Sequence, residues 1–274
     1  MLTFRNIDWN RAWSADRGIR SKGNDQEFWN RRAPSFSQHV QGDDGDDYVD
    51  PFLEIMDPQF EWSVLDVGCG PGTLACPLAK IVRRVTAIDF SPVMLDILRD
   101  RKQSAGIENI TEREARWEDD WQALGIERHD VAVASRSIAS DDPQALLTKL
   151  MAFAGQRVYI SCAVGDGPFD REIFEAVGRK RDANPDYIYI YNLLYQMGFN
   201  ANVRLIEKKM RTYAGEDEAI DSVRWMLEDM TAAEEDVLRR FISAHLVADG
   251  KRWRLDFQRS VSWAVIWWKV AGKP

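Results

Sequence analysis

The chain has 274 residues, of which 45% are apolar and 29% are charged, and its formal net charge is −8. This length and apolar content suffice for one large domain, or for one domain with an elaborated lid. The acidic balance argues against a nucleic-acid partner, because phosphate binding needs a basic surface. No apolar run approaches the roughly 18 residues of a membrane span, and the first residues lack the apolar core of a signal peptide.

The cysteines are few, odd in number and in or near apolar segments: Cys69, Cys76 and Cys162. This usage predicts small core side chains in a reducing compartment, hence a cytoplasmic protein, rather than a disulfide framework. The three histidines do not cluster, so the sequence predicts no metal site.

Residues 1–60 precede the first apolar strand and are predicted to form a helical N-terminal extension. Within it, residues 24–33 are predicted to form a short helix that ends near Pro34, since proline lacks an amide proton. The acidic run 42–47 does not match the calcium-loop pattern and is predicted to be a solvated loop. A further helix is expected through residues 52–56.

From residue 62 onward, apolar strands alternate with amphipathic helices, which predicts a parallel sheet wound by right-handed crossovers. The segment 185–198 has strand-like composition, but its length and Gly198 favour a helix. Strands are expected near 62–65, 84–88, 109–112, 129–135, 157–162, 202–210 and 260–268. Helices are expected near 73–81, after Ser91, and over 142–150, 185–198, 216–230 and 232–248.

The stretch Asp66-Val-Gly68-Cys69-Gly70-Pro-Gly72 lies between the first strand and the following helix. Glycines there let the backbone approach a ligand closely, and Asp89, at the end of the next strand, is placed to bind ribose hydroxyls. A dinucleotide loop needs a third glycine where this chain has Thr73. A carboxylate at Asp66 would also repel a pyrophosphate, but it suits a cationic amino-acid group.

Residues 64–73 closely resemble the first motif of the class I S-adenosylmethionine-dependent methyltransferases, and Asp89 with the residues after it resembles their second motif. The resemblance covers about residues 62–270. It implies an α/β fold, with a Rossmann-like, doubly wound, seven-stranded sheet that is mostly parallel and has an antiparallel last strand. It further implies a methyltransferase domain over 61–274 with a helical insertion at about 214–250, and an extension over 1–60 that acts as a lid.

The resemblance implies S-adenosylmethionine as the cofactor and S-adenosylhomocysteine as the product. In this family the acid of the first motif helps to place the methionine ammonium, partly through water, and the glycine loop runs along the methionine and ribose. The acid of the second motif binds the ribose hydroxyls, and the next residue packs on the adenine. The corresponding residues here are Asp66, Gly68, Cys69, Gly70, Asp89 and Phe90.

Two further parts of the cofactor site are expected after the third and fourth strands. The family commonly has an Asp-Ala pair after the third strand, where this chain has Arg116 and Trp117. Either Glu118 supplies the acid, or backbone groups and Trp117 hold the adenine, or Trp117 only covers a neighbouring helix. After the fourth strand, Ser135 is expected to offer its backbone carbonyl to the cofactor ammonium.

The substrate candidates are less constrained by the sequence. Arg136 could bind an anionic group of the acceptor, or it could pair with an acid such as Asp141 or Asp166. Phe169 and Arg171, after the fifth strand, could line the acceptor pocket or belong to a structured loop. From the N-terminal extension, Trp29 and Arg32 are candidates for contact with cofactor or substrate.

Methyl transfer from a sulfonium mainly requires positioning and exclusion of water, and no catalytic base is identified. The acidic charge and the missing Asn-Pro-Pro-Tyr-type motif favour a small-molecule acceptor over nucleic acid, and a homodimer is compatible with the sequence. Two other functions stay open: a regulatory protein that binds S-adenosylmethionine without turnover, and an NAD-dependent oxidoreductase.

Overall fold

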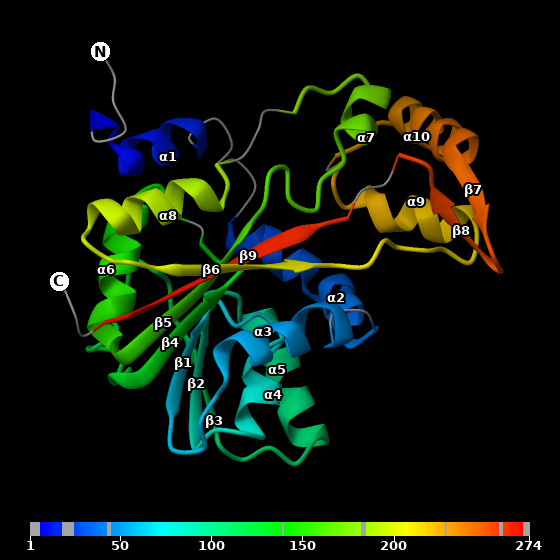
Figure 1. Ribbon diagram of the computed structural model, residues 1–274. Helices are drawn as coiled ribbons and strands as arrows, with labels where there is room; N and C mark the ends of the chain where they lie inside the picture. Colours follow the sequence, from blue (N-terminus) through cyan, green and yellow to red (C-terminus); the bar gives the residue numbers. More distant parts are fainter. Residues whose placement is uncertain are drawn as a thin grey trace. The chain divides into compact units, whose positions relative to one another are not determined.

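The computed structural model describes residues 6–17, 25–42, 45–138, 140–181, 185–227, 229–257 and 260–270. The chain divides into two compact units (Figure 1). The first unit contains residues 1–164, 185–206 and 263–274, and the second contains 165–184 and 207–262. Within the described ranges, no helix is both long and apolar enough to cross a membrane.

The first unit is built around a seven-stranded sheet with the order β3-β2-β1-β4-β5-β9-β6. Neighbouring strands from β3 to β5 pair in parallel, and β9 pairs antiparallel with β5. This arrangement confirms the predicted fold class. The strands are β1 Ser63–Val67, β2 Arg84–Asp89, β3 Ile110–Glu114, β4 His129–Ser135, β5 Ala154–Ala163, β6 Asn202–Glu207 and β9 Ser262–Lys269.

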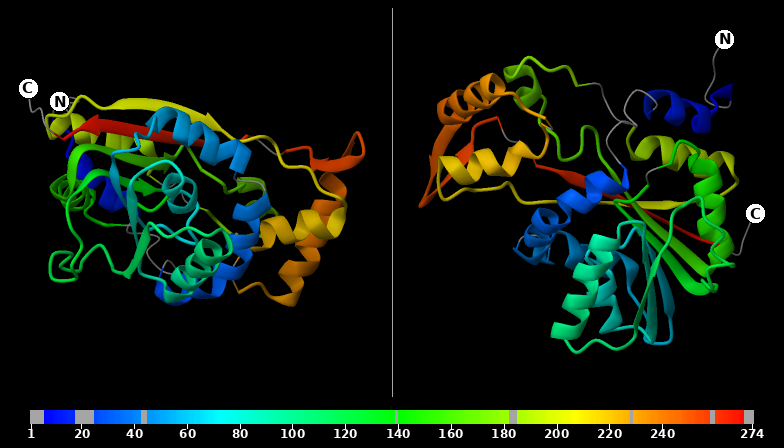
Figure 2. Two further views of the ribbon diagram at one scale, coloured as in Figure 1. Left: turned by 90° about the horizontal axis from the view of Figure 1, so that it is seen from below. Right: turned by 180° about the vertical axis from the view of Figure 1, so that it is seen from behind.

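Helices cover both faces of this sheet (Figures 1 and 2). One face packs against α3, α4 and α5, and the opposite face packs against α1, α6 and α8. Trp263 and Trp267 lie on the first face and Trp268 on the second, so both sides of β9 are apolar core. The helices are α1 Trp9–Arg17, α2 Gln26–Gly42, α3 Asp50–Met56, α4 Ala75–Ala79, α5 Pro92–Ser104, α6 Pro143–Phe153 and α8 Tyr187–Gln196.

Three of these helices begin where the sequence indicates. The Ser91 side chain accepts a hydrogen bond from the Met94 amide at the start of α5. The Asp142 side chain accepts a hydrogen bond from the Ala145 amide at the start of α6. The Asp186 side chain accepts one from the Ile188 amide at the start of α8. Residues 187–196 are therefore helical, as predicted. Side-chain oxygens at these positions satisfy amides that have no partner inside the helix.

The N-terminal extension departs from its prediction at two points. Helix α2 continues through Pro34 to Gly42 instead of ending there. Pro34 deprives the helix of one amide, but Ala33 and Ser37 are buried, and this packing holds the helix together. The predicted solvated loop, 42–47, overlaps a π-helical turn, Gly45–Val49, whose last two residues, Tyr48 and Val49, lie beyond the predicted loop and are buried.

The second unit has its own apolar core, formed by side chains such as Ile173, Ile220 and Leu238. Its elements are α7 Arg171–Ala176, α9 Glu216–Arg224, α10 Ala232–His245, β7 Leu246–Asp249 and β8 Arg252–Leu255. The predicted capping box at the start of α10 is present. The prediction that this helix runs to residue 248 is wrong, because residues 246–249 pair with 252–255 in a hairpin.

Candidate functional site

The glycine turn connects β1 to α4 at the carboxyl edge of the sheet, where ligands of open α/β sheets bind. The amides of Gly68 and Cys69 donate to the Ile88 carbonyl at 2.8 and 3.0 Å, which ties the turn to β2. Gly68, Gly70 and Gly72 all have positive φ angles, which L-residues with a Cβ rarely adopt. Burial raises the pKa of the Cys69 thiol, so this side chain is a neutral part of the core.

The three glycines differ in what surrounds them. A Cβ added to Gly68 would lie 2.4 Å from Ser137 Cβ, and one added to Gly72 would lie 2.4 Å from Leu98 Cδ1. Among the described residues beyond its chain neighbours, a Cβ at Gly70 would meet Phe36 alone, at 3.8 Å. Packing within the protein therefore requires glycine at the outer two positions, whereas the described residues leave room for a Cβ at Gly70.

Asp89, at the end of β2, is buried and holds the turn from the side. Its Oδ2 accepts the Gly70 amide at 2.8 Å, and its Oδ1 accepts the Ser91 amide at 2.9 Å. Burial raises the pKa of this carboxyl, against the hydrogen bonds from these amides. Because a carboxylate has about four acceptor sites, Asp89 keeps capacity for a ligand hydroxyl beside these backbone amides.

Asp66 is the second buried carboxyl of the site and is 1% exposed. Its Oδ2 has no hydrogen-bond partner among the described residues. Burial, followed by repulsion from Asp89, raises the pKa of Asp66 to about 7. A buried carboxylate oxygen without a partner is costly, and a cationic ligand group beside it would remove that cost.

Helix α2 contacts this edge of the sheet through residues that sequence reasoning missed. Gln26 Nε2 donates to the Phe90 carbonyl at 2.5 Å, and its Oε1 accepts from Arg116 at 2.8 Å. Ser91 Oγ donates to Asn30 Oδ1 at 2.6 Å. The one signal of this face in the sequence is the spacing of Gln26 and Asn30, which lie four positions apart.

The two predicted contact residues of α2 lie in an aromatic group of that helix. The Trp29 ring packs edge-on against Phe28 and Phe36, at centroid distances of 5.3 and 5.9 Å. The Arg32 guanidinium lies 5.8 Å from the Trp29 ring. Since Phe36 also faces Gly70, this group borders the glycine turn.

In the segment after β3, Trp117 contacts the loop that follows β4, whereas Glu118 points to solvent. The Trp117 indole donates to the Ser137 carbonyl at 3.3 Å, and its ring lies 5.6 Å from that of Trp121. Ser137 Oγ in turn donates to the Val67 carbonyl at 2.7 Å, so Trp117 is linked to the end of β1. Glu118 is exposed.

The end of β4 carries Ser135 and Arg136, and both contact Tyr48. Tyr48 Oη lies 2.5 Å from Ser135 Oγ, and the Arg136 guanidinium lies 4.1 Å from the centroid of the Tyr48 ring. Arg136 has a φ of +56°, in the left-handed region. Asp141 pairs with Arg17 and Asp166 pairs with Arg171, and whether Arg136 also pairs with an acid stays a prediction.

Comparison with known proteins identifies the family. Residues 64–154 match the family model of a methyltransferase domain. An uncharacterised protein from Haemophilus influenzae is 33% identical over 249 residues, which is 88% of each chain. The chain belongs to the class I S-adenosylmethionine-dependent methyltransferase superfamily. The cofactor of this superfamily is S-adenosylmethionine.

Two further similarities are a short sequence match and a match of fold. The ubiquinone/menaquinone biosynthesis C-methyltransferase from Zymomonas mobilis is 35% identical over 67 residues, 24% of this chain and 28% of that protein. The crystal structure of the YcgJ protein from Bacillus subtilis shares the fold, with a TM-score of 0.55 and 11% identity. The match covers 81% of this chain and 97% of that one.

The residues of this superfamily member fit its cofactor at three points. The Oδ2 of Asp66, which has no partner among the described residues, suits a cationic ammonium group, and Gly70 has no side chain to keep a ligand from its backbone. Asp89 supplies acceptor capacity for hydroxyls at the end of the neighbouring strand.

The raised pKa of Asp66 predicts how the stability of the free protein depends on pH. The ordinary pKa is 3.8 and the folded value is about 7, so between these values the folded state binds the extra proton. Stability due to this group is therefore greatest at low pH and is lost as pH rises to about 7, by up to about 4 kcal/mol. Urea unfolding from pH 4 to 8 should show Asp66→Asn gaining stability over wild type across that range. A constant difference would contradict the assignment.

The remaining acceptor candidates belong to the second unit. The Phe169 ring packs 5.1 Å from Trp225 and lies 3.5 Å from the Arg181 guanidinium. Arg171 Nε donates to Asp166 Oδ2 at 2.7 Å. Both side chains thus have structural contacts within their own unit, and their role toward a substrate stays a prediction.

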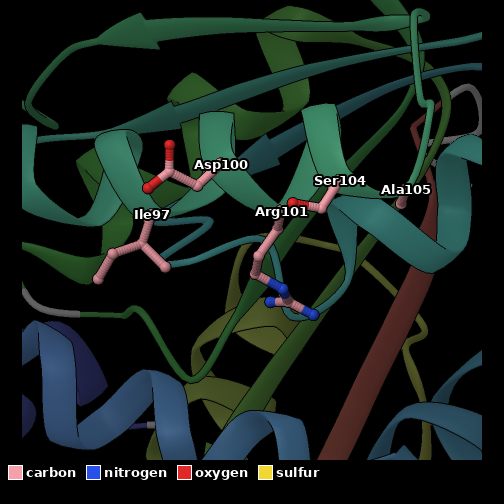
Figure 3. A pocket seen from close by; sticks show the side chains of 5 residues that line it. All are labelled: Ile97, Asp100, Arg101, Ser104 and Ala105. Carbon is pink, nitrogen blue, oxygen red and sulfur yellow. The ribbon is translucent and has the colours of Figure 1, made fainter.

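A surface depression lies on α5, lined by Ile97, Asp100, Arg101, Ser104 and Ala105 (Figure 3). It contains none of the residues at the strand ends. Its Arg101 donates to the Pro71 carbonyl at 2.6 Å, which anchors the glycine turn from the side of α5. The contribution of this depression to the site is therefore structural support.

Proposed function

We propose that this protein transfers a methyl group from S-adenosylmethionine to a small-molecule acceptor that carries an anionic group. The observation that carries the proposal is the pair of buried carboxyls, Asp66 and Asp89, at the ends of β1 and β2 beside an accessible Gly70. This pair suits a ligand with a cationic group and a ribose, and it disfavours a pyrophosphate.

The proposed cofactor contacts follow from these positions. Asp66 would bind the ammonium group, with the Ser135 carbonyl as a second acceptor, and Asp89 would accept the ribose hydroxyls. Gly68, Cys69 and Gly70 would line the methionine and ribose. Phe90 and Trp117 would border the adenine, with Glu118 as the alternative acid. Residues 1–60 would act as a lid on the domain formed by 61–274, with Trp29 and Arg32 facing the ligands.

The cofactor supplies a methyl group that its sulfonium already activates, so the protein's task is mainly to orient the acceptor and exclude water. The contacts of α2 with Phe90 and Ser91 support such a cover over the ribose end of the site. Arg136, at the end of β4, is the proposed contact for a carboxylate or phosphate of the acceptor, because a guanidinium binds such groups bidentately.

The net charge of −8 supports a small acceptor, since a long polyanion would be repelled. The test is a methyl-transfer screen with labelled S-adenosylmethionine against a metabolite extract, RNA and protein. We expect label in the metabolite fraction. Label in RNA or protein alone would contradict the proposed acceptor.

The two other functions make different predictions in the same assays. A regulatory protein would bind S-adenosylmethionine but transfer no label to any fraction. An oxidoreductase would bind NAD, which the buried Asp66 and Thr73 both disfavour. Titration with each cofactor, followed by the transfer screen, separates the three.

A further inference from the structure

Three hydroxyl groups meet at the carboxyl ends of β4 and β5. Tyr48 Oη lies 2.5 Å from Ser135 Oγ and 2.6 Å from Ser161 Oγ, and the two serine oxygens are 3.4 Å apart. Tyr48 and Ser161 are buried, whereas Ser135 is partly exposed. The group joins the turn before α3 to two adjacent strands of the sheet.

This group orders its neighbours through hydrogen bonds. Each of the three hydroxyls can donate one hydrogen bond and accept others. Buried polar groups that satisfy one another in this way rigidify the structure around them.

The group holds Arg136, through both its backbone and its side chain. The Arg136 amide donates to Ser161 Oγ at 2.9 Å and to the Ser161 carbonyl at 3.2 Å. These bonds fix Arg136 in its left-handed conformation, which is unfavourable for a residue with a Cβ. The guanidinium lies over the Tyr48 ring at 4.1 Å and 5.6 Å from the Trp263 ring. Strain of this kind is commonly kept where it directs a functional group.

We propose that Tyr48 is a positioning residue that fixes Arg136 to receive a carboxylate or phosphate group of the methyl acceptor. The proposal rests on the proposed function. The Tyr48 ring holds the guanidinium by a cation–π contact, and the hydroxyl holds the Arg136 backbone through Ser161. Both contacts order Arg136 before the acceptor binds, which lowers the entropy cost of a bidentate ion pair.

The test removes the Tyr48 hydroxyl and keeps its ring. In Tyr48→Phe we expect the KM for the acceptor in the labelled metabolite fraction to rise about tenfold. The affinity for S-adenosylhomocysteine, measured by calorimetry, should change by less than about twofold. Tyr159→Phe is the matched control, because Tyr159 is equally buried and its hydroxyl donates to the Met56 carbonyl at 3.1 Å. This control should leave both quantities unchanged.

A double-mutant cycle separates positioning from a merely structural role. In an Arg136→Gln background, Tyr48→Phe should cause no further rise in KM. An equal rise in both backgrounds, or an unchanged KM in Tyr48→Phe alone, would overturn the inference while leaving the proposed function intact. If wild type binds S-adenosylhomocysteine but labels no metabolite, the proposed function fails and this inference with it.

Discussion

Replacing Asp89 by alanine should weaken the binding of S-adenosylmethionine by more than about tenfold. The carboxylate accepts the amides of Gly70 and Ser91, at 2.8 and 2.9 Å. Its removal therefore costs the proposed ribose contacts and also releases the glycine turn. Calorimetric titration of the variant and of wild type measures the change.

The matched control for this variant is Asp130→Ala. Asp130 Oδ2 accepts the Ser63 amide at 2.8 Å, so it makes the same kind of contact at the opposite end of β1. We expect Asp130→Ala to lower stability without changing cofactor affinity. Equal affinity in wild type and Asp89→Ala, or equal losses in both variants, would remove Asp89 from the binding site.

Replacing Gly70 by alanine should abolish or greatly weaken cofactor binding in a protein that stays folded. Among the described residues beyond its two chain neighbours, a Cβ at this position meets no atom closer than 3.8 Å, so it projects into space that the cofactor is proposed to fill. The φ of +54° adds backbone strain of about 1 kcal/mol. Titration of the variant with S-adenosylmethionine, beside an unfolding curve, separates the two effects.

Gly106→Ala is the control for backbone strain alone. Gly106 has a φ of +63°, and an added Cβ there would meet no atom of the described residues within 4 Å, its chain neighbours aside. Both variants should lose similar stability, but only Gly70→Ala should lose affinity. Normal binding by Gly70→Ala would mean that the turn does not contact the ligand. Gly68→Val is less informative, because its side chain would collide with Ser137 and threaten the fold.

Local signals in the sequence predicted the frame of the site. Ser91 before Pro92 and Asp142 before Pro143 mark helix starts that the structure contains. Apolar strands that end in Asp66 and Asp89 predicted two carboxyls at one edge of the sheet. These predictions succeed because capping and strand burial depend on neighbouring residues in the chain.

The missed features depend on contacts between distant residues. Nothing near Tyr48 in the sequence indicates Ser135 and Ser161, which lie 87 and 113 residues away. Helix α2 continues beyond Pro34 because the burial of Ala33 and Ser37 outweighs the local tendency of proline to end a helix. Leu246 forms a strand because it pairs with Leu255, which no local pattern specifies.

The central claim is that Asp66, Gly70 and Asp89 form a binding site for S-adenosylmethionine. Its most direct test is a calorimetric titration of the wild-type protein with S-adenosylmethionine and, separately, with NAD. We predict saturable binding of S-adenosylmethionine at one site per chain, lost in Gly70→Ala, and no binding of NAD. Absence of S-adenosylmethionine binding, or binding of NAD in its place, would contradict the account.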